Sequence, residues 1–199
     1  LRSLWGETSA ETSEGYGRLV LTARAVALLR PEAGLADAAD QIVSSLLTAG
    51  FVDQATGWLN SVDEGSPAWA QIVSANPDAV AAVDSGDITS LDEGKSGKRA
   101  KFFLAAMAGL GKINAEQAND AAESLEVALG RQDAWTRALE KAVMAGEQGT
   151  VVVLAALGLQ GNAWGAVDPV YLYRAVSALN RVGLQSEARL IAAEAVARG

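Results

Sequence analysis

The end of the sequence carries the pattern that most restricts how this chain can fold. Asp168 is a good helix N-cap, and Pro169 stands at the first helical position, where its missing N–H costs nothing. Apolar residues then recur at steps of three and four through residues 172–182, until Gly183 ends the run. A second amphipathic run, residues 184–195, follows almost at once. Because so short a turn forces antiparallel packing, the sequence predicts a helical hairpin here.

The same order of residues occurs near residue 50. In both places an apolar run ends at a Gly, and a small residue then opens the apolar face of the next helix. Gly50 is followed by Ala55 in this way, and Gly183 by Ala188. Small side chains at these positions allow two helix backbones to approach closely. The sequence therefore repeats one turn pattern, and it predicts the same kind of helical hairpin in two places.

These two turns resemble the inter-helix turn of tetratricopeptide-type repeats, in which a Gly precedes a small residue of the second helix. Gly34 with Ala39 matches the same pattern more loosely. The resemblance covers about a third of the chain, and the first-helix Trp and closing Pro of the full repeat of about 34 residues are absent. It implies an all-α fold of stacked antiparallel helical hairpins, arranged as a solenoid-like (TPR-like) right-handed superhelix. The block from Trp164 onward also resembles the C-terminal region of large uncharacterised bacterial proteins, which implies no activity.

The composition agrees with packed helices. Of the 199 residues 50% are apolar and only 6% aromatic, and the chain is rich in Ala, the best helix former. A chain of this length can build one well-cored domain or two small ones. Residues 84–101 are the most irregular part of the sequence, with acidic residues first and basic residues after them. We therefore expect a single α-helical domain over residues 1–199, or two packed sub-bundles with a boundary near residues 84–98.

Charge and missing residue types exclude several classes of function. The formal net charge of -8 opposes an extended phosphate-binding surface, so we expect no nucleic-acid partner. The chain has no Cys and no His, which removes disulfides, thiolate nucleophiles, Cys/His zinc sites and imidazole catalysis. We accordingly expect no catalytic residue, no metal ligand and no cofactor. The sequence starts at Leu1 without a leader pattern, so we expect a fragment or processed product, either cytoplasmic or periplasmic after removal of a signal segment.

Further helices are expected along the chain from apolar spacing, caps and breakers. Residues 102–110 are apolar on every side but too short for a transmembrane segment, so they predict a helix buried all round. Residues 150–159 begin with consecutive Val, which favours a strand, yet the Ala-rich continuation and helical neighbourhood favour a buried helix. The other expected helices are residues 19–29, 35–46, 51–62 and 66–75, a short one from Pro77, and an amphipathic pair at 114–129 and 133–145.

Two loop segments partly match the sequence patterns of ligand-binding loops. Residues 89–96, TSLDEGKS, differ by one residue from a phosphate-binding loop, but Thr89 replaces the first Gly and acidic residues stand where phosphate would lie. Asp84, Asp87, Asp92 and Glu93 offer oxygen ligands for calcium, but their spacing does not match a calcium loop. The spacing of Glu123 and Glu126 arises by chance on many polar helix faces. We therefore interpret these segments as solvated surface.

The aromatic residues give the candidate binding site. Trp58, Trp69 and Trp135 occupy helical positions typical of core residues. Trp164 lies instead in a Gly-rich loop, and Tyr171 and Tyr173 follow on the next helix, where they cannot both share the buried side. Exposed aromatic side chains are typical of partner-binding hot spots. Trp164, Tyr171 and Tyr173 are thus the candidate partner-binding residues.

These observations favour a non-catalytic helical-repeat scaffold for protein–protein interaction, because helical repeats expose extended binding surfaces. The competing hypothesis is an enzyme or small-ligand-binding helical domain that uses carboxylates and Tyr in a cleft between helices. Self-association of the hairpins into a homo-oligomer is a third hypothesis. The identity of the protein partner does not follow from the sequence.

Overall fold

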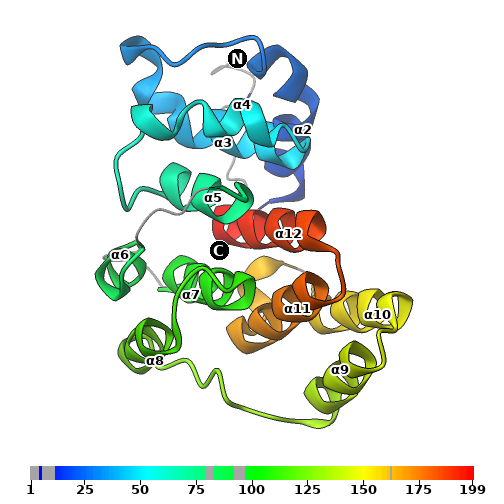
Figure 1. Cartoon of the computed structure of the whole chain (residues 1–199). Coiled ribbons are helices and arrows are strands. Elements are labelled where there is room, and N and C mark those ends of the chain that lie inside the picture. The colour runs from blue at the N-terminus through cyan, green and yellow to red at the C-terminus, as the bar shows by residue number, and fades with distance from the viewer. Residues whose placement is uncertain (1–4, 6–11, 79–82, 92–96, 162) are drawn as a thin grey trace.

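The structure, a computed structural model, describes residue 5 and residues 12–78, 83–91, 97–161 and 163–199 (Figure 1). Over these residues all regular secondary structure is helical, which confirms the predicted all-α class. None of the helices in this part of the chain has the length and apolar character needed to cross a membrane. The α-helices are α2 Ser13–Val26, α3 Ala39–Thr48, α4 Val52–Thr56, α5 Pro67–Ala75, α6 Ser85–Ser90, α7 Lys98–Leu110, α8 Ala115–Ser124, α9 Ala134–Met144, α10 Gln148–Leu159, α11 Pro169–Arg181 and α12 Gln185–Arg198. Short 3-10 helices cover Ala33–Ala38, Leu59–Ser61 and Trp164–Ala166.

The C-terminal hairpin, α11 and α12, lies at the centre of the molecule. In Figure 1, α12 runs between α5 on one side and α7 on the other, and it also packs against α3. Its partner α11 packs on α7, α9 and α10. Close approach on several sides is possible because small residues such as Ala188, Ala192 and Ala195 form the buried surface of α12. The helices are therefore not stacked in chain order, since the last helix contacts elements from the first half.

Two clusters of buried apolar residues make up the core. One cluster joins α2, α3, α4 and one face of α5, and the other joins the opposite face of α5 with helices α6 to α12. Helix α12 also contributes to both, because Ala193 belongs to the first cluster and Ala192 to the second. Helices α5 and α12 thus connect the two clusters. The boundary expected near residues 84–98 stays a prediction.

One turn geometry recurs at three hairpins, α3–α4, α9–α10 and α11–α12. Each first helix ends at a Gly in the left-handed conformation, with φ of 77° at Gly50, 69° at Gly146 and 90° at Gly183. In the second helix of each hairpin, the backbone N–H of the fifth residue after the Gly donates a hydrogen bond. The acceptor is the carbonyl oxygen of the first residue after the Gly. The donor–acceptor pairs are Ala55–Phe51, Val151–Glu147 and Ala188–Leu184, each at 3.0 Å. The sequence pattern missed the middle turn because Val151 stands where the other two hairpins have Ala.

Several helices begin and end as their residues predict. Helix α5, expected over residues 66–75, begins at Pro67, and Ser66 caps it by accepting a hydrogen bond from the backbone N–H of Trp69 at 3.2 Å. Every side chain from Phe102 to Met107 in α7 is fully buried, so the prediction of a helix buried all round is confirmed for this stretch. Asn114 and Asp133 cap α8 and α9 with reciprocal hydrogen bonds to the third helical residue.

Other boundaries were predicted wrongly. Helix α2 begins at Ser13 rather than at residue 19, because Thr12 caps it by accepting from the N–H of Gly15. The helix expected over residues 51–62 is only the short α4, followed by a turn and a 3-10 helix. Helix α8 ends at Ser124 and does not pair with α9 but packs on α6 and α7. The expected short helix from Pro77 falls partly on residues 79–82, outside the described residues.

Helix α10 confirms the choice of helix over strand for residues 150–159, but the expectation that this helix is buried was wrong. Only Val151 and Ala155 of α10 are buried, while Val152, Val153 and Leu157 are 45%, 59% and 51% exposed. The reason is that α10 packs mainly on α9 and α11, which leaves Val152, Val153 and Leu157 largely uncovered by the described residues. An apolar pattern on every side of a helix is compatible with a buried helix, but the pattern alone does not establish that the helix is buried.

Candidate functional site

Trp164 lies in the 3-10 helix before α11 and is half-buried. Its ring meets the buried ring of Phe102 edge-on, with 6.0 Å between the centroids. Its indole N–H donates to a carboxylate oxygen of Glu194 in α12 at 3.3 Å. Trp164 therefore joins the loop to both α7 and α12, and only part of its surface is left for a partner.

Tyr171 and Tyr173 lie on α11 in different surroundings. The ring of Tyr171 stacks on that of Trp135 in α9, with 4.5 Å between the centroids, whereas Tyr173 packs beneath the guanidinium of Arg174 at 5.2 Å. Within the described residues no aromatic contact joins Trp164 to either tyrosine. The three candidate residues are thus half-buried at separate places and do not form one aromatic cluster.

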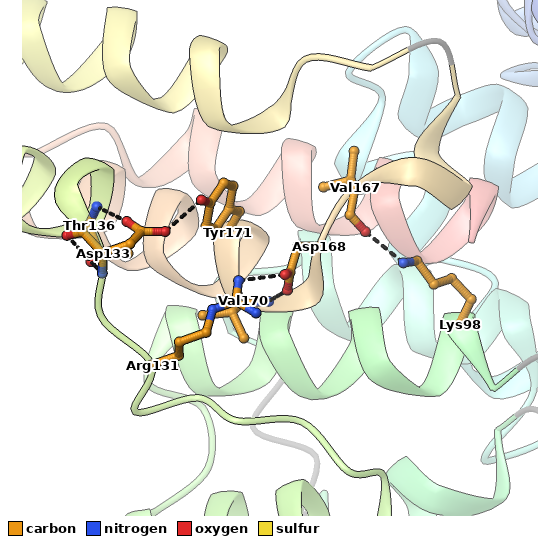
Figure 2. A network of polar contacts seen from close by, with 8 residues as sticks. All are labelled: Lys98, Arg131, Asp133, Thr136, Val167, Asp168, Val170 and Tyr171. Atoms are coloured by element: carbon orange, nitrogen blue, oxygen red, sulfur yellow. Dashed lines mark hydrogen bonds and ion pairs between the residues drawn. The ribbon is translucent and has the colours of Figure 1, made fainter.

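Tyr171 belongs to a polar network that connects the starts of α9 and α11 (Figure 2). Its hydroxyl donates to the Asp133 carboxylate at 2.6 Å, and that carboxylate also caps α9 by accepting from Thr136 N–H at 2.8 Å. The neighbouring cap, Asp168, accepts from the N–H of Val170 and forms an ion pair with Arg131. Both helix caps are therefore fixed by a side chain from outside their own helix.

The same network shifts the proton affinities of its members. The hydrogen bond from Tyr171 is the largest cause that lowers the pKa of Asp133, and the same bond raises the pKa of Tyr171. Asp133 thus stays a carboxylate and Tyr171 keeps its proton. Beside them, Lys98 donates to the carbonyl of Val167 at 2.6 Å, which fastens the loop before α11 onto α7 (Figure 2). These contacts hold two helices in a fixed relation.

Along the exposed sides of α9 and α11 runs an open groove of about 830 Å³, which we call the α9–α11 groove. Its lining includes Thr136, Ala145 and Met144, and the side chain of Met144 is 80% exposed. The charged residues that line it are Arg137, Glu140, Lys141, Arg174 and Arg181. Four of these five are basic, although the chain as a whole carries a net charge of -8. The groove is therefore a local basic surface on an acidic protein.

Two of the groove's arginines are held by the protein. Arg181 binds both carboxylate oxygens of Glu140, at 2.8 and 2.9 Å, and this hydrogen bonding lowers the pKa of Glu140. Arg174 donates from one terminal nitrogen to the carbonyl of Leu129 at 3.0 Å, while its Nε is buried without a hydrogen-bond partner. Arg137 and Lys141 form no ion pair with any described residue. These two side chains are the ones that can meet an anionic ligand without losing an existing partner.

Sequence reasoning did not single out this groove. Arg137 and Lys141 stand four residues apart and so share one face of their helix, and Arg174 and Arg181 are polar positions within the apolar spacing of theirs. What the sequence lacked was the contact between α9 and α11, which brings the two faces together. A cluster of basic residues in an acidic chain was the available signal.

The two loop patterns are only partly described. Asp84 and Asp87 bind each other's backbone N–H groups at the start of α6, each at 2.9 Å, so they act as a capping box. Asp92, Glu93 and the rest of residues 92–96 lie outside the described residues, as does most of the phosphate-loop pattern. In the part of the chain that the structure describes, no group of three or more acidic residues is arranged to hold a metal ion.

No known protein family, curated protein or solved structure matches this chain. A functional assignment therefore depends on the geometry of the chain itself.

Proposed function

We propose that this protein is a non-catalytic helical-repeat scaffold for protein–protein interaction, and that the α9–α11 groove binds an acidic segment of its partner. The observation that carries the proposal is the sign of charge in the groove. Four basic side chains and one acidic side chain line it, on a chain with a net charge of -8. Such a local reversal of sign attracts a short acidic segment and orients it as it approaches.

The arrangement of α9 to α12 supports the repeat part of the proposal. These helices form two consecutive hairpins with the same Gly turn, and the first helix of the second hairpin packs on both helices of the first. The caps of the two first helices, Asp133 and Asp168, are 168 - 133 = 35 residues apart. This is close to the tetratricopeptide period of about 34 residues. The finer proposal is that α9–α12 are two units of a solenoid-like, right-handed stack.

A protein segment suits the groove better than nucleic acid does. A long polyanion would meet the negative charge of the whole chain, whereas a short acidic segment meets mainly the field of the groove, within about 10 Å. The exposed side chain of Met144 adds an apolar contact of an adaptable kind. A partner with two or three acidic residues next to a large apolar one fits both features.

The competing hypothesis, a carboxylate- and tyrosine-based enzyme, is less well supported. General acid–base chemistry by such groups calls for a carboxyl pKa raised toward neutrality or a tyrosine pKa lowered toward it. Among the described carboxyl groups, those of Asp133 and Glu140 have lowered pKa values, and the pKa values of Tyr16 and Tyr171 are raised. These shifts favour groups that hold structure and bind.

The proposal is tested by fluorescence anisotropy with a dye-labelled peptide of glutamates flanking two leucines. We expect binding that weakens with added salt and is lost when glutamine replaces the glutamates. The double variant Arg137→Glu/Lys141→Glu should lose binding. The matched control is Arg24→Glu/Arg30→Glu, which changes the net charge equally at two exposed positions away from the groove. Equal loss of binding in both variants would show that net charge alone is responsible, and would contradict the proposal.

Self-association is the second candidate, and the unpartnered apolar face of α10 favours it. Val152, Val153 and Leu157 expose between 45% and 59% of their surfaces on this helix. Burial of such a face in a dimer would remove this area from water. Light scattering at two protein concentrations tests this, with Val153→Lys as the variant. A mass that stays monomeric at both concentrations would rule self-association out.

A further inference from the structure

A second pocket, of about 220 Å³, is lined by residues of α2, α3, α5 and α12. It is separate from the α9–α11 groove, which is lined by other residues. Helix α12 supplies one wall and α2, α3 and α5 supply the others, and Leu19, Leu47 and Ala193 of this lining belong to the first core cluster. The walls are mostly apolar and include Leu19, Leu47, Leu190 and Ala193. An apolar cavity of about 150 Å³ is large enough for benzene, so this pocket has room for a ring with a small substituent.

One buried polar side chain faces this pocket without a complete set of partners. Gln71 is only 2% exposed, and its amide oxygen accepts a hydrogen bond from the hydroxyl of Ser44 at 2.8 Å. That bond fixes the orientation of the amide. The amide nitrogen of Gln71 forms no hydrogen bond with a described residue, and it is not among the fully enclosed polar atoms, so it can be reached from the pocket that Gln71 lines. Because an amide N–H that opens into a pocket is free to donate, the amide nitrogen of Gln71 can bind an acceptor of a ligand there.

More donors surround the same space. Arg198 stacks over the ring of Tyr16 at 4.5 Å and pairs with Glu194 at 2.8 Å, but its Nε is buried without a partner. Burial, with the nearby charge of Glu194, raises the pKa of Tyr16, so the Tyr16 hydroxyl keeps its proton and remains a donor. Since Glu194 already balances the charge of Arg198, the pocket offers hydrogen-bond donors without a net positive charge.

We infer that this pocket binds a small uncharged molecule with an apolar ring and a carbonyl-type acceptor, and that Gln71 provides the specific hydrogen bond. The apolar body fills the space between the leucines, and the acceptor takes the N–H of Gln71. An anionic ligand is disfavoured because it would face Glu194. The inference concerns a different surface from the α9–α11 groove and does not depend on the proposed function.

The test uses three probes of similar size: benzamide, benzoate and benzene. We expect benzamide at millimolar concentration to raise Tm and to shift the side-chain amide resonances of Gln71 in a heteronuclear NMR titration. Benzoate should bind at least tenfold more weakly than benzamide. If benzamide does not shift the Gln71 resonances, the inference is wrong and the pocket holds water alone. Binding of benzoate as tight as that of benzamide would overturn the predicted selectivity.

Two variants and a control separate the role of Gln71 from general stability. Gln71→Leu keeps the volume and removes the amide, so benzene should still bind while the advantage of benzamide over benzene disappears. Leu190→Phe adds bulk at the half-buried wall of α12 and should weaken all three probes, which keeps the test decisive if Gln71→Leu does not fold. Gln185→Leu, at an exposed position of α12 outside the pocket, should behave as the wild type. An unchanged preference for benzamide in Gln71→Leu would contradict the assignment.

Discussion

Substitution of Gly109 by Ala tests the central position of the C-terminal hairpin. Gly109 lies in α7 where α11 crosses it, and a Cβ added there would stand 2.9 Å from a methyl carbon of Val176 and 3.0 Å from the backbone oxygen of Tyr173. Carbon atoms in ordinary contact are about 3.5–4.0 Å apart. The backbone oxygen cannot rotate away, and Val176 is fully buried. The two helices would have to separate.

Two opposing effects set the magnitude of this change. Replacing Gly by Ala inside a helix stabilises it by up to about 1 kcal/mol, whereas overpacking a filled core costs about 1–3 kcal/mol. Gly109 is near the end of α7, so the helix gain is at its smaller end and the overpacking wins. We expect Gly109→Ala to lower the free energy of unfolding by about 1–2 kcal/mol, which corresponds to a fall in Tm of roughly 2–8 °C.

Urea denaturation measures this, with Gly17→Ala as the matched control. Gly17 lies inside α2, and a Cβ there would meet nothing within 4 Å, so only the helix gain applies. The control should be stabilised by about 0.5–1 kcal/mol, and the slope with urea should stay the same in both variants. If Gly109→Ala were as stable as Gly17→Ala, then α7 and α11 would not be in the close contact on which the central position of the hairpin depends.

Three further outcomes are expected. Gly158→Ala should destabilise the chain by about 2 kcal/mol and alter tryptophan fluorescence, because the added Cβ would lie 2.2 Å from the ring of Trp135; unchanged emission would contradict this. Burial lowers the pKa of Lys112 to about 8 from 10.5, so between these pH values the unfolded chain binds more protons than the folded one. The stability contribution of Lys112 should accordingly rise by about 1 kcal/mol from pH 7.5 to pH 10, allowing for solvent screening, and the rise should be absent in Lys112→Met when both are compared by urea unfolding. Trp164→Ala should lower Tm by a few degrees through loss of the contacts with Phe102 and Glu194; an unchanged Tm with weaker partner capture would instead assign Trp164 to binding.

Sequence alone could predict features that depend on neighbouring residues. The caps at Ser66, Asn114 and Asp133, and the Gly turns at Gly50 and Gly183, are local, because a side chain and the backbone a few residues away determine them. The same locality explains why the start of α2 was missed. Its cap, Thr12, stands in a segment without apolar periodicity, so the hydrophobic pattern gave no sign of it.

Features that depend on distant contacts could not be predicted. The small residues of α12 indicate that other helices approach it closely, but they do not indicate that these are α5 and α7. The exposure of Val153 in α10 likewise depends on which helices pack against α10, and an apolar pattern does not contain that information.

The same distinction between local features and distant contacts applies to the candidate site. Trp164 is a candidate because it lies in a Gly-rich loop, and Tyr171 and Tyr173 because they cannot both share the buried side of one helix. In the structure all three are half-buried at separate contacts. The α9–α11 groove and the pocket beside Gln71 are built from segments far apart in the chain. Their residue types are unremarkable one at a time, and only the fold brings them together.

Affinity purification of the protein from its native cells, in three forms, tests the proposed scaffold function most directly. The forms are the wild type, the groove variant Arg137→Glu/Lys141→Glu and the control Arg24→Glu/Arg30→Glu. The account predicts that the wild type and the control capture the same partner, that this partner carries an acidic segment, and that the groove variant loses it. Capture of the same partner by all three forms would contradict binding through the α9–α11 groove.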